Sequence, residues 1–448
     1  MQNYKQQFKG KKITIMGLGL LGRGLGYTKF LAECGADLIV TDLKTEKQLA
    51  TSLKVLNKFR NIKYTLGEHK LEDFRNRDMI IKNPGIPLDS IYIKEARKNN
   101  IPIEMDVSLF VKIAKGVKVV GVTGTRGKSM TTILSYNILK ENIKGKNVYL
   151  GGNIRGVATL PLLNKIKEGD IIVCELDSWQ LQSFGEARIS PNISVFTTFM
   201  SDHMNYYLND MNKYFDDKAN IFKFQKKTDT LIILPGMKEY IKKTDAKGKF
   251  IIVKPKEVNS WKFNVLGEHH RNNLACAVEV AKQFHIPITK IKKSVAKFKD
   301  LEGRLQLLKT YKGIKIYNDN NATTPEATIA GIKALFSPEP GSGERKIVLV
   351  CGGADKGLPL DEFVKIINKH CKAVVMIPGT GTERLIKNYK LKIKNEMGQN
   401  LNDIIKKAII HAKKGDTILF SPAFASFGMF NNEYERNDLF MKIIKKLK

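Results

Sequence analysis

Residues 123–129 read Thr-Gly-Thr-Arg-Gly-Lys-Ser, a combination of residue types that can grip phosphate groups. An apolar run at 117–122 precedes this segment and a helical pattern at 130–140 follows it, which is the strand, loop and helix order of a P-loop. In such loops, backbone N–H groups and the helix N-terminus bind phosphate oxygens. Lys128 would neutralise phosphate charge, and the Ser129 hydroxyl would ligate Mg²⁺. The residues expected to bind the phosphates are Gly124, Thr125, Arg126, Gly127, Lys128 and Ser129.

The match to the P-loop consensus is imperfect, because Val122 stands where the first glycine belongs. An ordinary glycine turn before a helix is the alternative interpretation. Gly-Lys-Ser at a strand-to-helix junction is nevertheless a specific signal, so the sequence predicts a nucleotide phosphate site at this loop.

Side chains able to bind metal or move charge follow two further apolar runs. Glu175 ends the run at 170–175, and His203 comes shortly after the run at 193–198. Ligands of open α/β sheets bind outside the carboxyl ends of the strands, so both side chains could lie beside the phosphate loop. Glu175 could hold a Mg²⁺ there. The alternatives are that Asp177 simply caps a helix with no metal nearby, and that His203 is a surface residue.

A second glycine turn lies near the N-terminus, after the apolar run at 12–16. Gly17, Gly19 and Gly22 have the G-x-G-x-x-G spacing, and Asp42 follows about 20 residues later, at the end of the next apolar run. Taken alone, this pattern predicts a dinucleotide-binding Rossmann unit and leaves an NAD-dependent dehydrogenase open. The same turn also binds other diphosphates, so it does not identify the ligand by itself.

The elements that must position these residues are α/β units. Apolar runs rich in Val and Ile alternate with helical patterns, which indicates parallel sheets covered by helices. The chain has 448 residues, too many for one ordinary core. Boundaries near 99–102 and 300–303 give three domains, at 1–99, 100–300 and 301–448. The predicted strands lie at 12–16, 37–41, 79–82, 117–122, 170–175, 193–198, 230–234, 346–351, 373–377 and 417–420.

Composition narrows the class of protein. No apolar run reaches the roughly 18 residues of a membrane span, and residues 1–12 are polar and basic, unlike a secretory signal. The five cysteines form no close C-x-x-C pair, which favours reduced thiols in a cytoplasmic protein over a zinc site. The net charge of +32 could serve nucleic acid or an anionic membrane. The lysines are spread along the chain and outnumber the arginines, so a solvated surface is the simpler interpretation.

Four central segments, in this order, resemble the Mur ligases, which build the peptide stem of bacterial cell-wall precursors. They are TGTRGKS at 123–129, CELDSWQLQ at 174–182, SDHMNYY at 201–207 and YFDDKANIF at 214–222. In that family a histidine of the third segment binds metal, and a lysine fifteen positions later is carbamylated and helps to bind a second Mg²⁺. His203 and Lys218 have this spacing. Without the resemblance, Lys218 would be interpreted as a solvated helix residue.

The resemblance implies a catalytic set and a metal set that overlap. The implied catalytic residues are Lys128, Glu175, His203 and Lys218. Two Mg²⁺ ions are implied, with ligands from Ser129, Glu175, His203 and carbamylated Lys218. ATP is the implied nucleotide at the phosphate loop.

The N-terminal glycine turn resembles that of one branch of the family, in which the turn holds a UDP diphosphate. An acid after the second strand contacts the uracil end in that branch, and Asp42 matches it. Residues 82–86 and 150–154 also resemble substrate-lining segments of this branch. The implied UDP-substrate residues are Gly19, Leu20, Leu21, Asp42 and Asn153.

The C-terminal part matches the same branch. Residues 266–273 resemble the nucleotide segment of the family, which implies that Asn273 contacts ATP. An arginine and an aspartate of the C-terminal domain also touch ATP in the family, and Arg304 and Asp319 match them. Residues 419–427 resemble the acceptor-binding end. The implied acceptor residues are Lys356, Ser426 and Phe427.

The sequence departs from the family pattern at four positions. Arg126 stands where asparagine is usual, and Asp177 stands where serine is usual. Asn321 replaces a usual lysine, and Glu433 replaces a usual aromatic residue. Three of these positions are expected near the phosphate or the acceptor, so they leave the acceptor amino acid open while the reaction type stays the same.

The resemblance implies an α/β protein with a Rossmann-like N-terminal domain, a P-loop-type central ATPase domain and a Rossmann-like C-terminal domain. The expected activity is ATP-dependent addition of D-glutamate to UDP-N-acetylmuramoyl-L-alanine through an acyl phosphate, in peptidoglycan precursor synthesis. We expect a cytoplasmic monomer without nucleic acid. A related Mur ligase or a folylpolyglutamate-type ligase with another acceptor is the alternative, although the latter lacks the N-terminal UDP-binding domain. A basic P-loop ATPase that binds nucleic acid is the more distant alternative.

Overall fold

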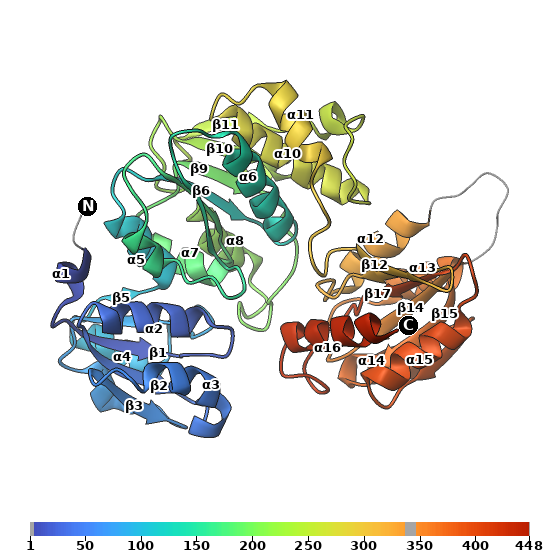
Figure 1. The fold of residues 1–448 in the computed structure, drawn as a ribbon, viewed down its shortest axis with the longest axis horizontal. Coiled ribbons are helices and arrows are strands. Elements are labelled where there is room, and N and C mark those ends of the chain that lie inside the picture. The colour runs from blue at the N-terminus through green and yellow to red at the C-terminus, as the bar shows by residue number, and fades with distance from the viewer. Residues whose placement is uncertain (1–3, 337–345, 448) are drawn as a thin grey trace. The chain divides into compact units, whose positions relative to one another are not determined.

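The computed structural model describes residues 4–336 and 346–447 of the 448-residue chain (Figure 1). Contacts divide the chain into two compact units, which are Met1–Trp261 with Asn272–Val295 and Lys262–Arg271 with Ala296–Lys448. The first unit carries two sheets and the second unit carries one. None of the helices in the described residues is long and apolar enough to cross a lipid bilayer.

The first sheet has five parallel strands in the order β3-β2-β1-β4-β5. Because all the strands run the same way, their carboxyl ends meet at one edge, where Gly17 follows β1 and Asp42 ends β2. The strands are β1 (Lys12–Met16), β2 (Asp37–Asp42), β3 (Ile62–Leu66), β4 (Met79–Lys82) and β5 (Ile103–Glu104). The helices are α1 (Tyr4–Phe8), α2 (Arg23–Glu33), α3 (Glu46–Leu56), η1 (Leu71–Phe74) and α4 (Ile91–Lys98).

The second sheet has six parallel strands in the order β11-β10-β9-β6-β8-β7. They are β6 (Lys118–Thr123), β7 (Val148–Gly152), β8 (Ile171–Glu175), β9 (Ile193–Phe196), β10 (Thr230–Ile233) and β11 (Lys249–Ile252). The longer helices are α5 (Asp106–Ile113), α6 (Lys128–Asn142), α7 (Ser178–Glu186), α8 (Met211–Ala219), α10 (Glu268–Lys282) and α11 (Ile288–Ala296). Shorter turns are η2 (Leu160–Asn164), η3 (Pro235–Met237), α9 (Lys238–Ile241) and η4 (Pro255–Val258).

The third sheet has six strands in the order β12-β13-β17-β14-β15-β16, and only β12 and β13 pair antiparallel. The strands are β12 (Gln306–Tyr311), β13 (Ile314–Asn318), β14 (Ile347–Gly352), β15 (Cys371–Ile377), β16 (Lys394–Met397) and β17 (Thr417–Phe420). The helices are α12 (Pro325–Leu335), α13 (Asp361–His370), α14 (Thr380–Asn388), α15 (Leu401–His411) and α16 (Glu433–Lys446).

One continuous hydrophobic cluster joins the first two sheets. It includes Ile13 and Leu38 of the first sheet, Phe110 of α5, and Ile172 and Phe184 of the second sheet and α7. Fully burying one such side chain contributes about 1.5–3 kcal/mol. The shared cluster therefore explains why the two sheets form a single unit, and it fixes the N-terminal glycine turn relative to the central strands.

The ten predicted strands are all present, and the predicted α/β class is confirmed. Seven strands of the described residues were not predicted, and they include both edge strands of every sheet: β3, β5, β7, β11, β12, β13 and β16. The edge strand β16 is largely exposed and lacks the apolar run that reveals a buried strand, whereas β11 is exposed although it carries Phe250, Ile251 and Ile252. The domain boundaries at 99 and 300 stay a prediction, and the first sheet continues to Glu104.

Candidate active site

The phosphate loop lies between β6 and α6, at the carboxyl edge of the second sheet. Gly127 is the N-cap of α6 and has a left-handed backbone with φ of 88°. A Cβ atom on Gly127 would lie 2.3 Å from Asn273 Oδ1, and one on Gly124 would lie 2.0 Å from Thr197 Oγ1. Only glycine fits at these two positions, and the helix N-terminus behind them is a natural phosphate site. The loop and buried Asn273 therefore lie together.

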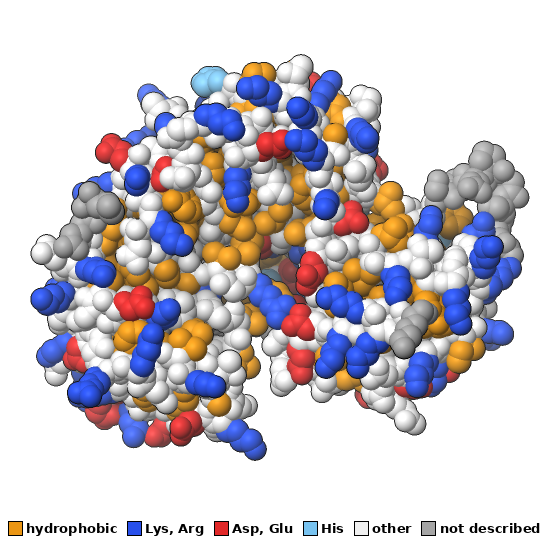
Figure 2. All heavy atoms as spheres, in the orientation of Figure 1, with side chains coloured by type: hydrophobic (Ala, Val, Ile, Leu, Met, Phe, Trp, Pro, Cys, Tyr) orange, Lys and Arg blue, Asp and Glu red, His pale blue; other side chains and the backbone are white. Residues whose placement is uncertain are grey.

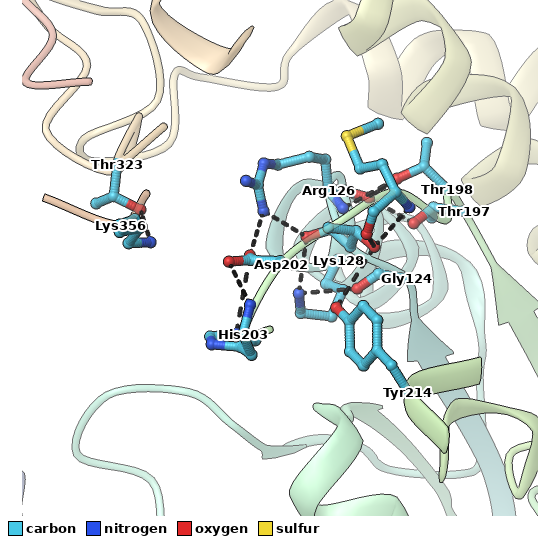
Figure 3. A network of polar contacts seen from close by, with 12 residues as sticks. Gly124, Arg126, Lys128, Thr197, Thr198, Asp202, His203, Tyr214, Thr323 and Lys356 are labelled. Carbon is cyan, nitrogen blue, oxygen red and sulfur yellow. Dashed lines mark hydrogen bonds and ion pairs between the residues drawn. The ribbon is translucent and has the colours of Figure 1, made fainter. Parts of the chain in front are cut away.

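Hydrogen bonds attach the phosphate loop to the segment that follows β9 (Figure 3). The Thr125 N–H donates to Thr198 O at 2.7 Å, and the Arg126 N–H donates to Thr198 Oγ1 at 2.9 Å. The Thr197 hydroxyl donates to Arg126 O at 2.5 Å. The conformation of the loop is thus fixed by residues roughly 70 positions away, which orders it before any phosphate arrives.

Two lysines donate to one carbonyl oxygen of the loop. Lys128 Nζ lies 3.0 Å from Gly124 O (Figure 3), and Lys218 Nζ also lies 3.0 Å from Gly124 O. Burial lowers the pKa of Lys128, while the carboxylate of Glu175 acts in the opposite direction. Two ammonium groups on one oxygen repel each other, so this arrangement favours the neutral form of one of them.

Lys218 is the group whose charge is disfavoured most. It is 1% exposed on α8, and its Nζ lies 4.8 Å from the ring centroid of Tyr214. Burial and then the nearby charge of Lys128 lower its pKa well below the ordinary value. The interpretation of Lys218 as a solvated helix residue is therefore wrong, because α8 turns it into the interior. A buried neutral amine is a nucleophile.

Glu175 and Asp177 have different roles at the end of β8. Glu175 is 4% exposed, and its backbone pairs in register with Val122 of β6 and Gly152 of β7. Its carboxylate therefore belongs to the same sheet edge as the phosphate loop. Asp177 is the N-cap of α7 and accepts the N–H of Gln180 at 2.7 Å. Asp177 therefore caps α7, as one interpretation of the sequence held.

His203 follows β9 in a strained conformation. Its φ of 56° is left-handed, which costs a residue with a side chain about 1–3 kcal/mol. Asp202 Oδ1 accepts the His203 N–H at 3.0 Å, and Asp202 Oδ2 pairs with Arg126 Nη1 at 2.7 Å. The imidazole lies against Trp179, with ring centroids 4.7 Å apart. Asp202 was not predicted from the sequence, although its position next to His203 was a signal.

No group of three or more His, Cys, Asp or Glu side chains within residues 4–336 and 346–447 is arranged to hold a metal ion. The hydroxyl of Ser129 and the carboxylate of Glu175 are oxygen ligands that suit Mg²⁺, which fills its remaining positions with water and phosphate oxygens. A lysine amine is a poor ligand for Mg²⁺, which prefers oxygen, so Lys218 would need an added oxygen group to bind this ion. Among the predicted metal residues, Ser129 and Glu175 carry the oxygen ligands that suit Mg²⁺.

The N-terminal glycine turn is held by Asp42. The Gly19 N–H donates to Asp42 Oδ2 at 2.9 Å, and the Lys44 N–H donates to Asp42 Oδ1 at 2.9 Å. Asp42 is 4% exposed, whereas Leu20 and Leu21 at the tip are 47% and 40% exposed. Asp42 therefore fixes the shape of the turn, and the two leucines present an apolar surface beside it.

Arg23 is a functional candidate that was not predicted from the sequence. It opens α2 directly after Gly22, and its Nη2 donates to Asn153 Oδ1 at 2.6 Å. Asn153 follows β7 of the second sheet, so this hydrogen bond joins the two sheets of the first unit. A guanidinium at the beginning of a helix is well placed for a phosphate, and its position after the glycine turn was the available signal.

The second unit places Arg304 and Asp319 together. Asp319 Oδ2 accepts the Ser421 hydroxyl at 2.8 Å, and Asp319 Oδ1 accepts the Leu305 N–H at 3.1 Å. Burial raises the pKa of Asp319 to about 7, while the hydrogen bond from Ser421 and the charge of Arg304 act in the opposite direction. Arg304 precedes β12 and Asp319 follows β13, and the antiparallel pairing of these two strands brings the residues together.

The acceptor candidates also belong to the second unit. Lys356 follows β14 and donates to Thr323 Oγ1 at 3.3 Å. Ser426 is 5% exposed and Phe427 is 62% exposed, so neighbouring residues of one loop have very different access to solvent. An isolated antiparallel bridge between Ala354 and Ala425 joins this loop to the segment that follows β14, which brings Lys356 and Ser426 into one part of the unit.

Asn321 and Glu433, two positions that depart from the family pattern, both take part in hydrogen bonds that involve backbone carbonyl oxygens. Asn321 Nδ2 donates to Glu302 O at 3.3 Å, and Asn320 Nδ2 donates to Glu433 O at 2.9 Å. Arg436 is fully buried, and its Nε donates to Asn320 Oδ1 at 2.8 Å. These contacts order the segment after β13 without a lysine at position 321.

Basic side chains on the face of the described residues drawn in Figure 2 do not form one area. On the face drawn in Figure 2, Lys and Arg side chains are scattered among acidic and apolar ones over every part of the chain in view. This distribution agrees with the interpretation of the +32 charge as a solvated, lysine-rich surface.

Three family models match the chain in order. Residues 11–104 match the Mur ligase MurD-like N-terminal domain, residues 122–250 match the Mur ligase middle domain, and residues 303–424 match the Mur ligase glutamate ligase domain. The chain belongs to the Mur ligase family. Mur ligases are ATP-dependent ligases.

Relatives of similar length support the membership in the Mur ligase family. The UDP-N-acetylmuramoylalanine--D-glutamate ligase of Borreliella burgdorferi strain ZS7 is 34% identical and aligns over 98% of this chain and 99% of its own. The enzyme of the same name from Roseiflexus sp. strain RS-1 is 32% identical with the same coverage. The fold resembles UDP-N-acetylmuramate-alanine ligase MurC of Thermotoga maritima, with a TM-score of 0.64, 18% identity, and coverage of 98% and 100%.

Proposed function

We propose that this Mur ligase joins D-glutamate to UDP-N-acetylmuramoyl-L-alanine in the cytoplasm, with ATP as the co-substrate. The observation that carries the proposal is the meeting of half-buried Lys128 and buried Lys218 on the carbonyl of Gly124, with the charge of Glu175 acting on Lys128. The names of the full-length relatives supply the substrates. The proposed domain boundaries are 1–99, 100–300 and 301–448.

The chemistry would proceed in two steps. An oxygen of the alanyl carboxylate attacks the γ-phosphorus of ATP, the bond to the β-phosphate oxygen breaks, and ADP leaves. The amine of the acceptor then attacks the acyl carbon, phosphate leaves with the bonding electrons, and the nitrogen loses a proton. Gly124, Thr125, Gly127, Lys128 and Ser129 would hold the phosphates, and Arg126 would contribute its backbone to the same loop while its side chain faces Asp202. Lys128 would stabilise the negative charge that spreads over the γ-phosphate.

The oxygen ligands support Mg²⁺ as the metal. Ser129 and Glu175 would hold one ion, and His203 with carbamylated Lys218 would hold the other. Bound Mg²⁺ neutralises the charge of the transferring phosphate and aligns its oxygens. The His203 N–H donates to Asp202, and Lys218 donates to Gly124 of the phosphate loop. These contacts would keep both proposed metal ligands close to the loop.

The environment of Lys218 supports carbamylation. Its buried nitrogen attacks the carbon of CO₂, and the product is a carbamate with the loss of one proton. The carbamate is an anion, and Lys128 and Arg126 are the cations whose charge already acts on this nitrogen. Carbamylation thus replaces a repulsion with an attraction.

A direct test of the carbamate uses ¹³C-labelled bicarbonate and ¹³C NMR. We expect a carbamate signal in the native enzyme and none in Lys218→Ala, together with a loss of activity of at least about 100-fold. Lys213→Ala is the matched control, because Lys213 lies on the same helix with its side chain 65% exposed. Full activity of Lys218→Ala would exclude the metal-bridging role.

The remaining candidates would bind the two ends of the substrates. Gly19, Leu20, Leu21 and Asn153 would receive the UDP moiety, while Asp42 would shape the turn around it. Asn273, Arg304 and Asp319 would contact ATP. Lys356 would anchor an acceptor carboxylate beside Ser426 and Phe427. The enzyme would act as a monomer.

The test of the function is an acceptor panel of D-glutamate, L-glutamate, aspartate, lysine and glycine. Each is mixed with UDP-N-acetylmuramoyl-L-alanine and ATP, and phosphate release and the mass of the product are measured. We expect an amide product with D-glutamate alone. A product with another acceptor would reassign the specificity to the departures at Asn321 and Glu433, and no product with any acceptor would overturn the function.

A further inference from the structure

The Arg126 side chain points along the phosphate loop toward Asp202 (Figure 3). Arg126 Nη1 lies 2.7 Å from Asp202 Oδ2 and 3.1 Å from Thr125 O. The Asp202 carboxylate is 9% exposed and the Arg126 side chain is 27% exposed. An ion pair this sheltered holds its geometry better than a surface pair, because little water competes for the charges.

The same carboxylate holds the backbone of His203. Asp202 Oδ1 accepts the His203 N–H at 3.0 Å, and Oδ2 lies 3.8 Å from His203 Nε2. His203 is the residue with a left-handed φ of 56°, a conformation that persists only when surrounding contacts impose it. Asp202 therefore joins the guanidinium of the phosphate loop to the strained residue.

We propose that Arg126 is a positioning residue that acts through Asp202 to fix His203 beside the phosphate loop. The role rests on the proposed function in assigning His203 to the metal site, but the geometry of the three residues does not. The guanidinium supplies a planar, permanently charged donor that a neutral side chain cannot replace. Arg126 thus couples the loop that binds the phosphates to the loop that carries the histidine.

Trp179 supplies a readout that needs neither ATP nor metal. Its ring centroid lies 4.7 Å from that of His203 and 5.6 Å from that of Tyr206, so its emission depends on the placement of residues 203–206. The chain has two tryptophans, and Trp261→Phe leaves Trp179 as the only tryptophan. In this background the tryptophan emission spectrum and its quenching by acrylamide report the position of residues 203–206, called the His203 loop below.

The experiment is a double-mutant cycle of Arg126→Ala and Asp202→Ala in the Trp261→Phe background. We expect each single variant to shift the Trp179 emission, to increase its quenching, and to lower kcat by about 10- to 100-fold while the KM for ATP stays within about twofold. The double variant should be no worse than either single variant, because both break the same connection. Arg126→Lys should restore part of the emission and of kcat.

Arg75→Ala is the matched control. Arg75 Nε lies 2.5 Å from Glu95 Oε1 in the first sheet region, so this variant breaks a similar ion pair away from the phosphate loop. It should leave the Trp179 emission and kcat unchanged, which separates positioning from a general loss of stability.

Two results would overturn the positioning role. An increase in the KM for ATP in Arg126→Ala, with unchanged Trp179 emission, would show that Arg126 acts on the nucleotide directly. Additive effects of the two substitutions would show that Arg126 and Asp202 act separately. If the native enzyme forms no product with any acceptor, the proposed function fails, while the emission of the four proteins in the cycle still decides whether Arg126 positions the His203 loop.

Discussion

The two glycine turns of the first unit have the same local geometry and different surroundings. Each follows the first strand of its sheet and ends at a left-handed glycine N-cap, Gly22 with φ of 82° and Gly127 with φ of 88°. The central loop is surrounded by three basic side chains, Lys128, Lys218 and Arg126, each held by its own contact.

The N-terminal turn is instead tied to a carboxylate, because the Gly19 N–H is bonded to Asp42. Its nearby cation is Arg23, which reaches Asn153 rather than the turn itself. The comparison teaches that a glycine turn before a helix gives a place for phosphate, while its neighbours decide between reaction and binding. The basic side chains at the central loop favour phosphoryl transfer there, whereas the N-terminal turn, held by Asp42, favours binding of a substrate.

The largest expected effect is that of Lys128→Ala at the central loop. Loss of the ammonium beside the γ-phosphate should lower kcat by about 10³-fold, because the charge is needed mainly in the transition state. Phosphate release under saturating substrates measures the effect. Activity within about tenfold of the native value would contradict the contrast between the two turns.

The glycine N-caps should respond differently to a methyl group. Gly127→Ala places a Cβ 2.3 Å from Asn273 Oδ1, whereas the nearest atom to a Cβ on Gly22 is Gly156 Cα at 3.7 Å. Gly22→Ala should therefore cost only the left-handed strain, about 1–2 kcal/mol, and Gly127→Ala should cost more. Thermal unfolding measures both. Gly67→Ala is the control, since Gly67 has φ of 86° and open space around it; equal losses in all three would show that the clash is relieved.

Arg23→Ala should separate binding from chemistry. Removal of a phosphate-binding guanidinium at the N-terminal turn should raise the KM for the UDP substrate by about 10-fold and leave kcat within about twofold. Steady-state kinetics with the UDP substrate varied gives both constants. A fall in kcat with an unchanged KM would mean that Arg23 acts on the reacting groups, and the two turns would no longer differ in role.

The smallest expected effect is a change in how stability depends on pH near the N-terminal turn. Burial lowers the pKa of Lys82 to about 8, and its Nζ donates to Ile86 O at 2.8 Å. Between about 8 and the ordinary 10.5 the unfolded chain carries one more proton than the folded one, so this lysine makes stability rise with pH.

Lys82→Met should remove that contribution, which is at most about 1.4 kcal/mol per pH unit for one proton. Chemical denaturation from pH 7.5 to 10.5, with the native enzyme as the reference, measures the slope. An unchanged slope would show that Lys82 carries the same charge in the folded and unfolded states over this range, so that folding does not lower its pKa.

The outcome for the strands follows their place in each sheet. The ten predicted strands are interior, because interior strands are buried on both faces and need continuous apolar runs. β11 and β16 lie at the edges of their sheets and are largely exposed, and β16 has no apolar run that would distinguish it from a loop. Pairing with a neighbour is what makes them strands, and that pairing involves residues far away in the sequence.

By itself the sequence determined the glycine turns, the carboxyl ends of the strands that bear Glu175 and His203, and the order of the family segments. These are local features, since each depends on a short run of residue types. Only the tertiary structure decided that Lys218 is buried against Gly124, that Asp42 holds Gly19, and that Arg126 pairs with Asp202. Each of these contacts joins residues that are 23 to 94 positions apart, so burial and charge at the site arise only when the sheets bring those residues together.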